Sequence, residues 1–466
     1  MAERAILVLE DGSAFRGFAF GASCDAEGEV VFNTGMTGYQ EIATDPSYRG
    51  QMVVLTYPLI GNYGVATLDE ESVRPWIAGL IVRDYYADYS NWRAEDDLAR
   101  YLQRAGVPAI RGVDTRALTR RLRTRGTMRA VLTRYGGEPD LAALTERARS
   151  VTPLGEKDLV GETSAKESYR YEGPDGPLPQ PLPGAGRGEG SPFPRGEGGQ
   201  GVRSVPPRVV VVDCGVKHNI LRSLRRRGAE VLVVPHTATA EDVLSLRPDG
   251  VVVANGPGDP ATLPSQVEMV RGLLASRLPL MGICLGHQLL GQAIGGTTSR
   301  LKFGHHGGNH PVKDLTTGRV HVTSQNHEFQ VDARSIPPES GFFVSHVNLN
   351  DGSVEGLAHP TLPVFSVQYH PEGSPGPQDN QYLFDRFLRL VEGALTPGPS
   401  PALRERGAEG GVRAEPTPPS PRGNGEEASL HRSAEEGPGS QPSEWEARAD
   451  AHASRLDGNG GRANGQ

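Results

Sequence analysis

The chain has 466 residues, 36% of them hydrophobic, and a formal net charge of −8 at pH 7. This length suits two or three domains, and the mild negative charge argues against a general nucleic-acid binder. With no long apolar run, no secretory-signal pattern at the first residues and only three cysteines, the sequence excludes membrane-spanning, secreted and disulfide-framework classes and favours reduced thiols in the cytoplasm.

The first domain is expected over residues 1–170 and should be a mixed domain rich in β-structure. Gly, Asp and Pro separate short apolar runs, which is typical of strands joined by hairpins and turns. Leucines at three- and four-residue spacing later in the block predict helices. The predicted strands are residues 5–9, 14–20, 29–33 and 51–56, and the predicted helices are residues 96–104 and 115–124.

Two segments break this globular pattern, residues 171–207 and residues 394–466. Both are poor in apolar residues and rich in Gly and Pro, with Ser, Arg and Glu between them. Such segments cannot bury enough apolar surface to offset the entropy that ordering removes. The composition therefore predicts a disordered linker and a disordered tail.

The second domain, residues 208–393, alternates strands with helices and is expected to have an α/β fold. Its strands are nearly continuous runs of Val, Ile and Leu, which is typical of a parallel sheet covered on both faces. The predicted strands are residues 208–212, 230–234, 250–254, 278–283 and 363–369. The predicted helices are residues 219–227, 264–275, 286–294 and 380–390.

The clearest chemical signal surrounds Cys284, in the run Gly-Ile-Cys-Leu-Gly-His-Gln at residues 282–288. A predicted strand ends, small residues allow a tight turn, and a helix begins, which is the geometry of a nucleophile elbow. Free N–H groups and partial positive charge at the start of the helix favour a thiolate and an adjacent oxyanion. We interpret Cys284 as a nucleophile; the alternative is a buried structural cysteine.

A base for this thiol is expected at the end of a later strand, in the run Gln-Tyr-His-Pro-Glu at residues 368–372. His370 would take the thiol proton and later protonate the leaving amine, while Glu372 would hold the imidazole tautomer. Pro371 keeps the chain extended between them. Alone, this run would be an ordinary surface loop, and the elbow before it favours the catalytic interpretation.

A third loop, Asn-Gly-Pro-Gly-Asp-Pro at residues 255–260, follows another predicted strand. Its glycines bring bare backbone close to a ligand. The N–H of Gly256 is expected to join that of Leu285 in an oxyanion hole. By itself this motif is weak.

At these residues the second domain resembles class I (triad-type) glutamine amidotransferases, through its Gly-Ile-Cys-Leu-Gly-His-Gln and His-Pro-Glu runs. The resemblance implies a catalytic triad of Cys284, His370 and Glu372. It also implies that glutamine is hydrolysed through a γ-glutamyl thioester and that ammonia passes to a synthase partner.

The first domain resembles the N-terminal domain of carbamoyl-phosphate synthase small chains. The resemblance lies in Phe-Asn-Thr-Gly-Met-Thr-Gly-Tyr-Gln-Glu and Thr-Asp-Pro-Ser-Tyr, and in three further runs. The likeness of the whole chain to this family covers about residues 6–391 apart from the linker. In the first domain the runs are residues 32–41, 44–48, 57–64 and 112–116, and the run at residues 213–220 opens the second domain in the style of the same family.

This second resemblance implies a heterodimer, or a higher oligomer, with a large chain that makes carbamoyl phosphate from bicarbonate for arginine and pyrimidine biosynthesis. The chain has no Gly-rich phosphate loop of the Walker type, so ATP and Mg²⁺ are expected at the large chain and no cofactor in this one. Neither nucleic acid nor membrane is an expected partner.

The resemblance also implies a set of glutamine contacts in both domains: Ser47, Gly256, Gly258, Leu285, Gln288, Asn326 and Phe329. One residue departs from the family pattern. Glu328 stands where a small residue, often Gly, is usual, and its carboxylate would repel that of the substrate unless it points outward. Glu328 is therefore left out of the expected site.

Other polar groups receive structural interpretations. His305, His306 and His310 lack a carboxylate or Cys at ligand spacing, so no metal is expected, and the basic run at residues 116–129 predicts a solvated helix face or a docking face for the large chain.

Two rival functions stay open. One is a glutaminase that serves another synthase or acts alone, and the other is a catalytically silent docking subunit.

Overall fold

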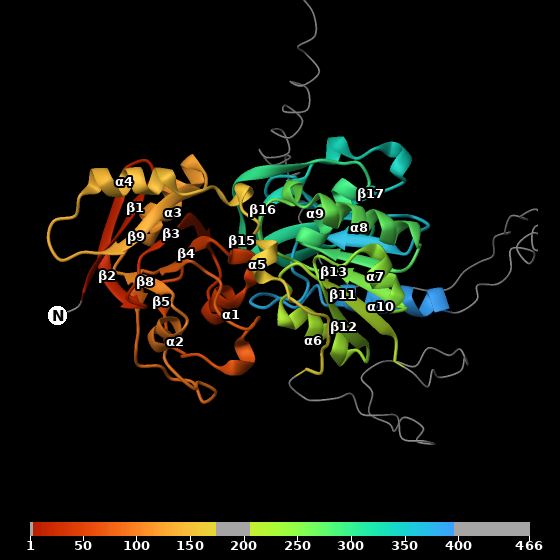
Figure 1. Cartoon of the computed structure of the whole chain (residues 1–466), viewed down its shortest axis with the longest axis horizontal. Coiled ribbons are helices and arrows are strands. Elements are labelled where there is room, and N and C mark those ends of the chain that lie inside the picture. The colour runs from red at the N-terminus through yellow and green to blue at the C-terminus, as the bar shows by residue number, and fades with distance from the viewer. Residues whose placement is uncertain (1–2, 174–205, 396–466) are drawn as a thin grey trace, which may run out of the picture. The chain divides into compact units, whose positions relative to one another are not determined.

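Seven strands of the N-terminal domain close into a barrel in this computed structural model, which describes residues 3–173 and 206–395 (Figure 1). The strand order is β1-β2-β8-β6-β4-β3-β9, closed by antiparallel pairing of β1 with β9. The barrel strands are β1 (Arg4–Leu9), β2 (Ala14–Gly21), β3 (Ala26–Asn33), β4 (Gln51–Leu55), β6 (Gly79–Ile81), β8 (Pro108–Arg111) and β9 (Met128–Arg134).

Helices cover the barrel, and two short strands pair beside it. Successive side chains of β3 point to opposite faces, so Val30 and Phe32 join the apolar cluster of α3 while Val31 joins that of α1 and α2. Burial on both faces explains the continuous apolar run of residues 30–32 in this strand. The elements are α1 (Tyr39–Thr44), η1 (Pro46–Tyr48), β5 (Leu59–Ile60), β7 (Asp84–Tyr85), α2 (Leu98–Arg104), α3 (Thr115–Arg125), α4 (Leu141–Ser150) and α5 (Val160–Thr163).

The second domain is built on a ten-stranded sheet in the order β10-β12-β11-β13-β14-β19-β18-β17-β15-β16. The strands from β12 to β19 in this order are parallel, as predicted, while β10, β18, β17, β15 and β16 pair antiparallel. The strands are β10 (Tyr169–Arg170), β11 (Arg208–Asp213), β12 (Glu230–Pro235), β13 (Gly250–Val253), β14 (Leu280–Ile283), β15 (Thr298–Asp314), β16 (Val320–Val331), β17 (Phe343–Asn348), β18 (Val354–Ala358) and β19 (Val364–Val367).

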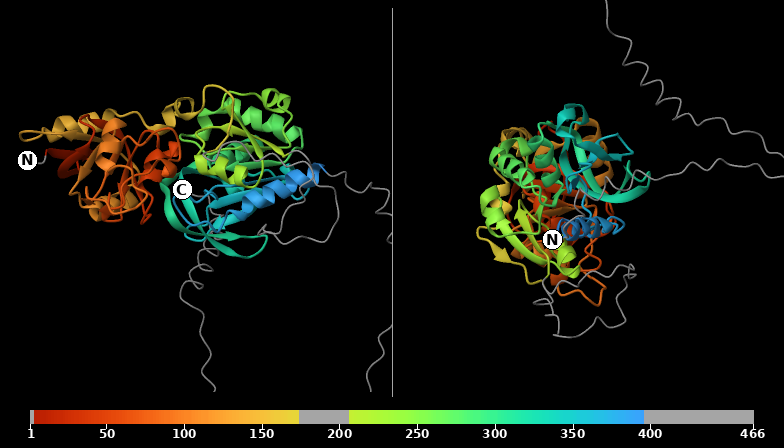
Figure 2. Two further views of the ribbon diagram at one scale, coloured as in Figure 1. Left: turned by 90° about the horizontal axis from the view of Figure 1, so that it is seen from below. Right: turned by 90° about the vertical axis from the view of Figure 1, so that its right-hand side faces the viewer.

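Helices cover both faces of the parallel half of this sheet. In β11, Val209 and Val211 face the cluster of α6 and α10, whereas Val210 and Val212 face that of α7, α8 and α9. Figure 2 shows the blue α10 on the side opposite the green α8. These helices are α6 (His218–Arg226), α7 (Ala240–Ser245), α8 (Pro264–Ala275), α9 (Leu285–Ala293) and α10 (Tyr382–Leu395).

The predicted elements are present, with ends shifted by a few residues. For example, α10 spans Tyr382–Leu395, where a helix at residues 380–390 is predicted. The antiparallel half of the sheet is an addition that the sequence patterns do not predict. Most of the predicted linker and tail lies outside the described residues. Within residues 3–173 and 206–395, no helix is both long and apolar enough to cross a bilayer.

The apolar face of α10 generates a stability prediction. Phe387 is fully buried in the cluster with the β11 valines. Phe387→Ala should lower the free energy of unfolding by about 3–5 kcal/mol, because it leaves a cavity. Arg389→Ala, two residues further along α10 at an exposed position, should change it by less than about 0.5 kcal/mol. Thermal unfolding of both variants measures the difference, and equal shifts would contradict the assigned helix face.

Candidate active site

Cys284 sits at a strained turn between β14 and α9. Its φ of 54° and ψ of −104° lie where L-residues are rarely found, and its N–H donates to Val367 O at 2.9 Å. Glycine is required on both sides of the turn, since a Cβ at Gly282 would lie 2.6 Å from Gly286 O and one at Gly286 would collide with Val253 O. The structure therefore forms the predicted elbow.

His370 and Glu372 follow β19, the strand paired in parallel with β14, so all three predicted catalytic side chains meet at the carboxyl ends of neighbouring strands. The His370 Nδ1–Glu372 Oε1 distance is 2.7 Å, and both side chains are fully buried. His370 Nε2, the other ring nitrogen, is buried and makes no hydrogen bond of ordinary geometry to any of the described residues. Burial opposes the charged imidazole, but Glu372 and the nearby Cys284 raise the pKa of His370 to about 10.

Lys217 is a fourth buried member of this group. Its Nζ lies 2.9 Å from Glu372 Oε1, and the side chains are 2% and 0% exposed. Burial favours the neutral acid, yet Lys217 and His370 lower the pKa of Glu372 to about 2. Burial likewise opposes the ammonium, and Glu372, Asp45 and Glu71 raise the pKa of Lys217 above its ordinary value. Glu372 is thus an ionised carboxylate held between two cations.

The N-terminal domain supplies two parts of the site. The barrel and the sheet belong to one compact unit, and Ser47 of η1 lines the same cavity as Cys284. Ser47 Oγ accepts from Asn255 Nδ2 at 3.0 Å, and the carboxylate of Asp45 accepts from Asn326 Nδ2 at 2.9 Å. These contacts fix the predicted substrate residues of both domains against each other.

A narrow cavity beside Cys284 brings the predicted glutamine contacts together. Its free volume is about 30 Å³, the room of one or two water molecules, so a larger ligand requires its walls to move apart. Leu285 does not line it, which suits a residue expected to act only through its backbone N–H. The predicted contacts on its wall are Ser47, Gly256, Gly258, Gln288, Asn326 and Phe329.

Glu328 also lines this cavity, although the sequence interpretation leaves it out of the site. Its side chain is buried, with only 8% of its surface exposed. His306 Nε2 lies 2.9 Å from Oε1, and Thr127 Oγ1 lies 3.1 Å from Oε2. Burial opposes ionisation, but His306 and Arg300 lower the pKa of Glu328. The carboxylate is therefore neutralised by its neighbours rather than directed outward.

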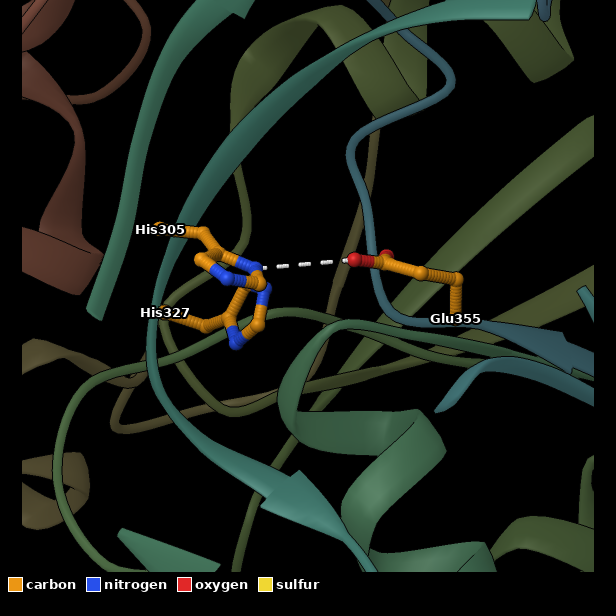
Figure 3. A group of neighbouring side chains, drawn as sticks. All are labelled: His305, His327 and Glu355. Carbon is orange, nitrogen blue, oxygen red and sulfur yellow. Dashed lines mark ion pairs between the residues drawn. The ribbon is translucent and has the colours of Figure 1, made fainter. Parts of the chain in front are cut away.

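A group of buried polar side chains lies next to the site, in which the side chains of His305 and His327 point toward Glu355 (Figure 3). Potential ligand atoms of these three residues lie within 4.8 Å of one another. The fold brings in carboxylates that the sequence spacing does not place there. Hydrogen bonds already engage these atoms: His305 Nε2 lies 2.8 Å from Asp351 Oδ2, and Glu355 accepts from two amide side chains. They account for the cluster without a cation, and the expectation of no metal stays a prediction.

A second, larger cavity of about 480 Å³ begins at His370 and Asn326 and leads away from the thiol. Its walls come from both domains and are formed mostly by small residues and loops. The remaining lining includes Thr34, Gly35, Met36, Thr37, Gly307, Gly308, Asn309, Pro375, Gly376 and Pro377.

Sequence reasoning missed Lys217, Asp45 and Asn255 as members of the site. Asn255 opens the predicted loop, and its polar side chain after a buried strand was an available signal. Lys217 falls in a run noted only for its resemblance. Nothing local marks Asp45, since its role depends on contact with the other domain.

Comparison with known families matches both halves of the chain. The family model described as carbamoyl-phosphate synthase small chain, CPSase domain, matches residues 7–132. That of class-I glutamine amidotransferases matches residues 210–390.

Curated proteins similar to this chain share nearly their whole length with it. The carbamoyl phosphate synthase small chain of Symbiobacterium thermophilum is 53% identical over 390 residues, covering 82% of this chain and 98% of that protein. That of a Nitratidesulfovibrio vulgaris strain is 48% identical, covering 84% and 99%. The pyrimidine-specific small chain of Bacillus subtilis is 47% identical, covering 83% and 95%.

The Lys217–Glu372 pair yields a pH-dependent prediction. Lys217→Met should destabilise the chain near neutral pH by about 3–5 kcal/mol, because it removes one of the two cations that stabilise the buried Glu372 carboxylate and leaves only His370 beside it. Without Lys217, burial raises the pKa of Glu372, so protonation relieves the penalty as the pH falls. The gap in unfolding temperature between wild type and variant should therefore narrow from about pH 8 to about pH 5.

Lys166→Met, at an exposed lysine, is the matched control and should show no gap at either pH. A gap for Lys217→Met that stays constant with pH would mean that Glu372 does not depend on Lys217 for its charge.

Proposed function

The chain belongs to the carbamoyl-phosphate synthase small chain family, as its sequence predicts, and from this premise we propose that it supplies ammonia by hydrolysing glutamine. The observation that carries the proposal is the buried Cys284, His370 and Glu372 group at the elbow. A docking subunit without chemistry has no use for a strained cysteine facing a charged histidine.

In the proposed reaction, the Cys284 sulfur attacks the side-chain amide carbon of glutamine. The carbon–nitrogen bond breaks, His370 gives a proton to the departing ammonia, and a γ-glutamyl thioester forms. His370 then takes a proton from water, whose oxygen attacks the thioester, and that proton returns to sulfur as glutamate leaves. Glu372 stays ionised throughout and stabilises the imidazolium.

Two backbone N–H groups are proposed to stabilise the oxyanion. That of Leu285 is the first of α9, where helices leave N–H groups without intrahelical acceptors. That of Gly256 belongs to the neighbouring loop, close enough that a Cβ on Gly256 would touch the Leu285 side chain at 2.9 Å. Ser47, Gly258, Gln288, Asn326 and Phe329 would bind the amino-acid end of the substrate.

The larger cavity supports the proposal that ammonia leaves on the far side of His370. His370 and Asn326 line it, so a product protonated by His370 emerges directly into it. It is roomy enough for ammonia and lies away from the narrow substrate cavity. Met36 on its wall is 71% exposed, so the proposal requires the docked large chain to cover this cavity and keep ammonia out of bulk water, where it would be protonated and lost.

The receiving partner in this proposal is the large chain of carbamoyl-phosphate synthase, in a heterodimer or higher oligomer. That chain would use ATP and Mg²⁺ to make carbamoyl phosphate from bicarbonate and ammonia for arginine and pyrimidine biosynthesis. Cys24, Cys214 and Cys284 are all free, which supports the proposed cytoplasmic setting.

Replacing the nucleophile separates this proposal from a silent docking role. In the complex with the large chain, Cys284→Ser should abolish carbamoyl-phosphate synthesis from glutamine by at least ~10³-fold, because Ser lacks an activated thiolate. Synthesis from added ammonia should be unchanged. Cys24→Ser, at an exposed cysteine of the N-terminal domain, is the control. Survival of glutamine-dependent synthesis in Cys284→Ser would refute the nucleophile assignment.

Filling the larger cavity tests the exit route. Gly308 lines it, and a Cβ there meets only ordinary or slightly tight contacts at 3.3–3.4 Å. Gly308→Phe should leave glutamate release within about twofold of wild type, while glutamine-dependent synthesis falls about tenfold and ammonia appears in solution. Gly137→Phe, at an open position, should change neither activity. If glutamine-dependent synthesis in Gly308→Phe stayed in step with glutamate release, ammonia would have to leave by another route.

A further inference from the structure

Glu328, the residue that departs from the family pattern, is bonded at both carboxylate oxygens. Oε1 faces His306 Nε2 at 2.9 Å, and Oε2 accepts from Thr127 Oγ1 at 3.1 Å and from Arg300 at 3.4 Å. Thr127 comes from the N-terminal domain, whereas the other residues belong to the β15–β16 hairpin. Glu328 thus joins the two domains at the wall of the substrate cavity.

The hydrogen-bond chain beyond His306 has a fixed direction. Asp45 carries a carboxylate, which only accepts, so the Asn326 amide must present its nitrogen to Asp45 at 2.9 Å. Its oxygen therefore faces His306 Nδ1 at 3.0 Å and accepts from it. The opposite orientation of the Asn326 amide would place two oxygen acceptors against each other at Asp45.

Both ring nitrogens of His306 consequently face oxygen acceptors, Asn326 Oδ1 and Glu328 Oε1. Only the doubly protonated imidazolium donates at both positions. The ring is buried and lines the substrate cavity, where an isolated cation would be costly. Glu328 provides the counter-charge within hydrogen-bond distance.

The same short stretch of β16 forms the wall opposite the thiol. The carbonyl of Asn326 accepts from Cys284 Sγ at 3.6 Å, and that of Phe329 accepts from Gln288 Nε2 at 2.9 Å. The side chains of Asn326 and Glu328 tie this stretch to the N-terminal domain from the other side. Moving the His306 ring would therefore shift the wall that faces the nucleophile.

We propose that Glu328 is a positioning residue for glutamine: it holds His306 as a cation, and His306 orients Asn326 and the cavity wall for the amino-acid end of the substrate. The proposal rests on the proposed glutaminase function. It assigns Glu328 a part in substrate affinity and none in the bond-breaking steps.

Glutamine binding can be measured separately from hydrolysis by the protection of Cys284 from iodoacetamide in the complex with the large chain. Glu328→Gln keeps the shape and loses the charge. We expect the glutamine concentration giving half-protection, and KM, to rise about tenfold, with kcat within about twofold. Alkylation without glutamine, and synthesis from ammonia, should match wild type. Glu339→Gln, at an exposed position, is the control and should change nothing.

A second variant tests whether Glu328 acts through His306. His306→Gln should raise the glutamine concentration that gives half-protection by a similar factor. In the double variant this concentration should be no higher than in the weaker-binding single variant, because the effects of two residues that act as one unit do not add. Unchanged protection in Glu328→Gln would overturn the proposal. So would a parallel loss of kcat and ammonia-dependent synthesis, which indicates a purely structural role. Protection without any hydrolysis in wild type would overturn the glutaminase function and leave this proposal standing.

Discussion

The ion pair between Lys217 and Glu372 is the interaction on which the rest of the site depends. Two charges removed from water are stable only when each is closely paired and hydrogen-bonded. Glu372 meets this condition by lying between Lys217 and His370, and Lys217 meets it through Glu372, Asp45 and Glu71. The charge of the triad is therefore set by a network that extends well beyond the triad itself.

This network makes the two domains chemically inseparable. Asp45 and Glu71 belong to the N-terminal domain, and Glu71 Oε1 also lies 2.9 Å from Arg222 of α6. Asp45 additionally holds Asn326, while Ser47 bonds to Asn255. The glutamine site proposed here lies where the barrel closes over the strand ends of the sheet. Because its cavity is narrow, a ligand the size of glutamine requires the walls of this cavity to move apart.

The spatial arrangement of Cys284, His370 and Glu372 could be predicted because its signals are local. Cys284 lies in a strand–turn–helix run with glycines on both sides, and His370 and Glu372 are two residues apart after a strand. Lys217 could not be predicted in the same way, because a lysine after a strand is ordinarily exposed, and its burial depends on Glu372 and the barrel carboxylates that are distant in the sequence. The role of Glu328 likewise depends on His306 and Thr127, which no sequence spacing connects to it.

The same distinction holds for the fold. Strands such as β11 are unbroken valine runs, and both faces of the sheet bury them. The β15–β16 hairpin was not predicted, because register shifts after Arg300 and Gly307 interrupt its alternation and polar side chains fill its buried face. This irregular hairpin carries His306, Asn326 and Glu328, so the part of the fold hardest to predict shapes the substrate wall.

The most direct test of this account is glutamate release from glutamine by the full chain, measured alone and in complex with the large chain, with and without ATP and bicarbonate. We expect release that depends on Cys284 and rises strongly when the complex turns over its other substrates. A complex that forms and uses free ammonia, yet releases no glutamate under any of these conditions, would contradict the account and identify the chain as a docking subunit.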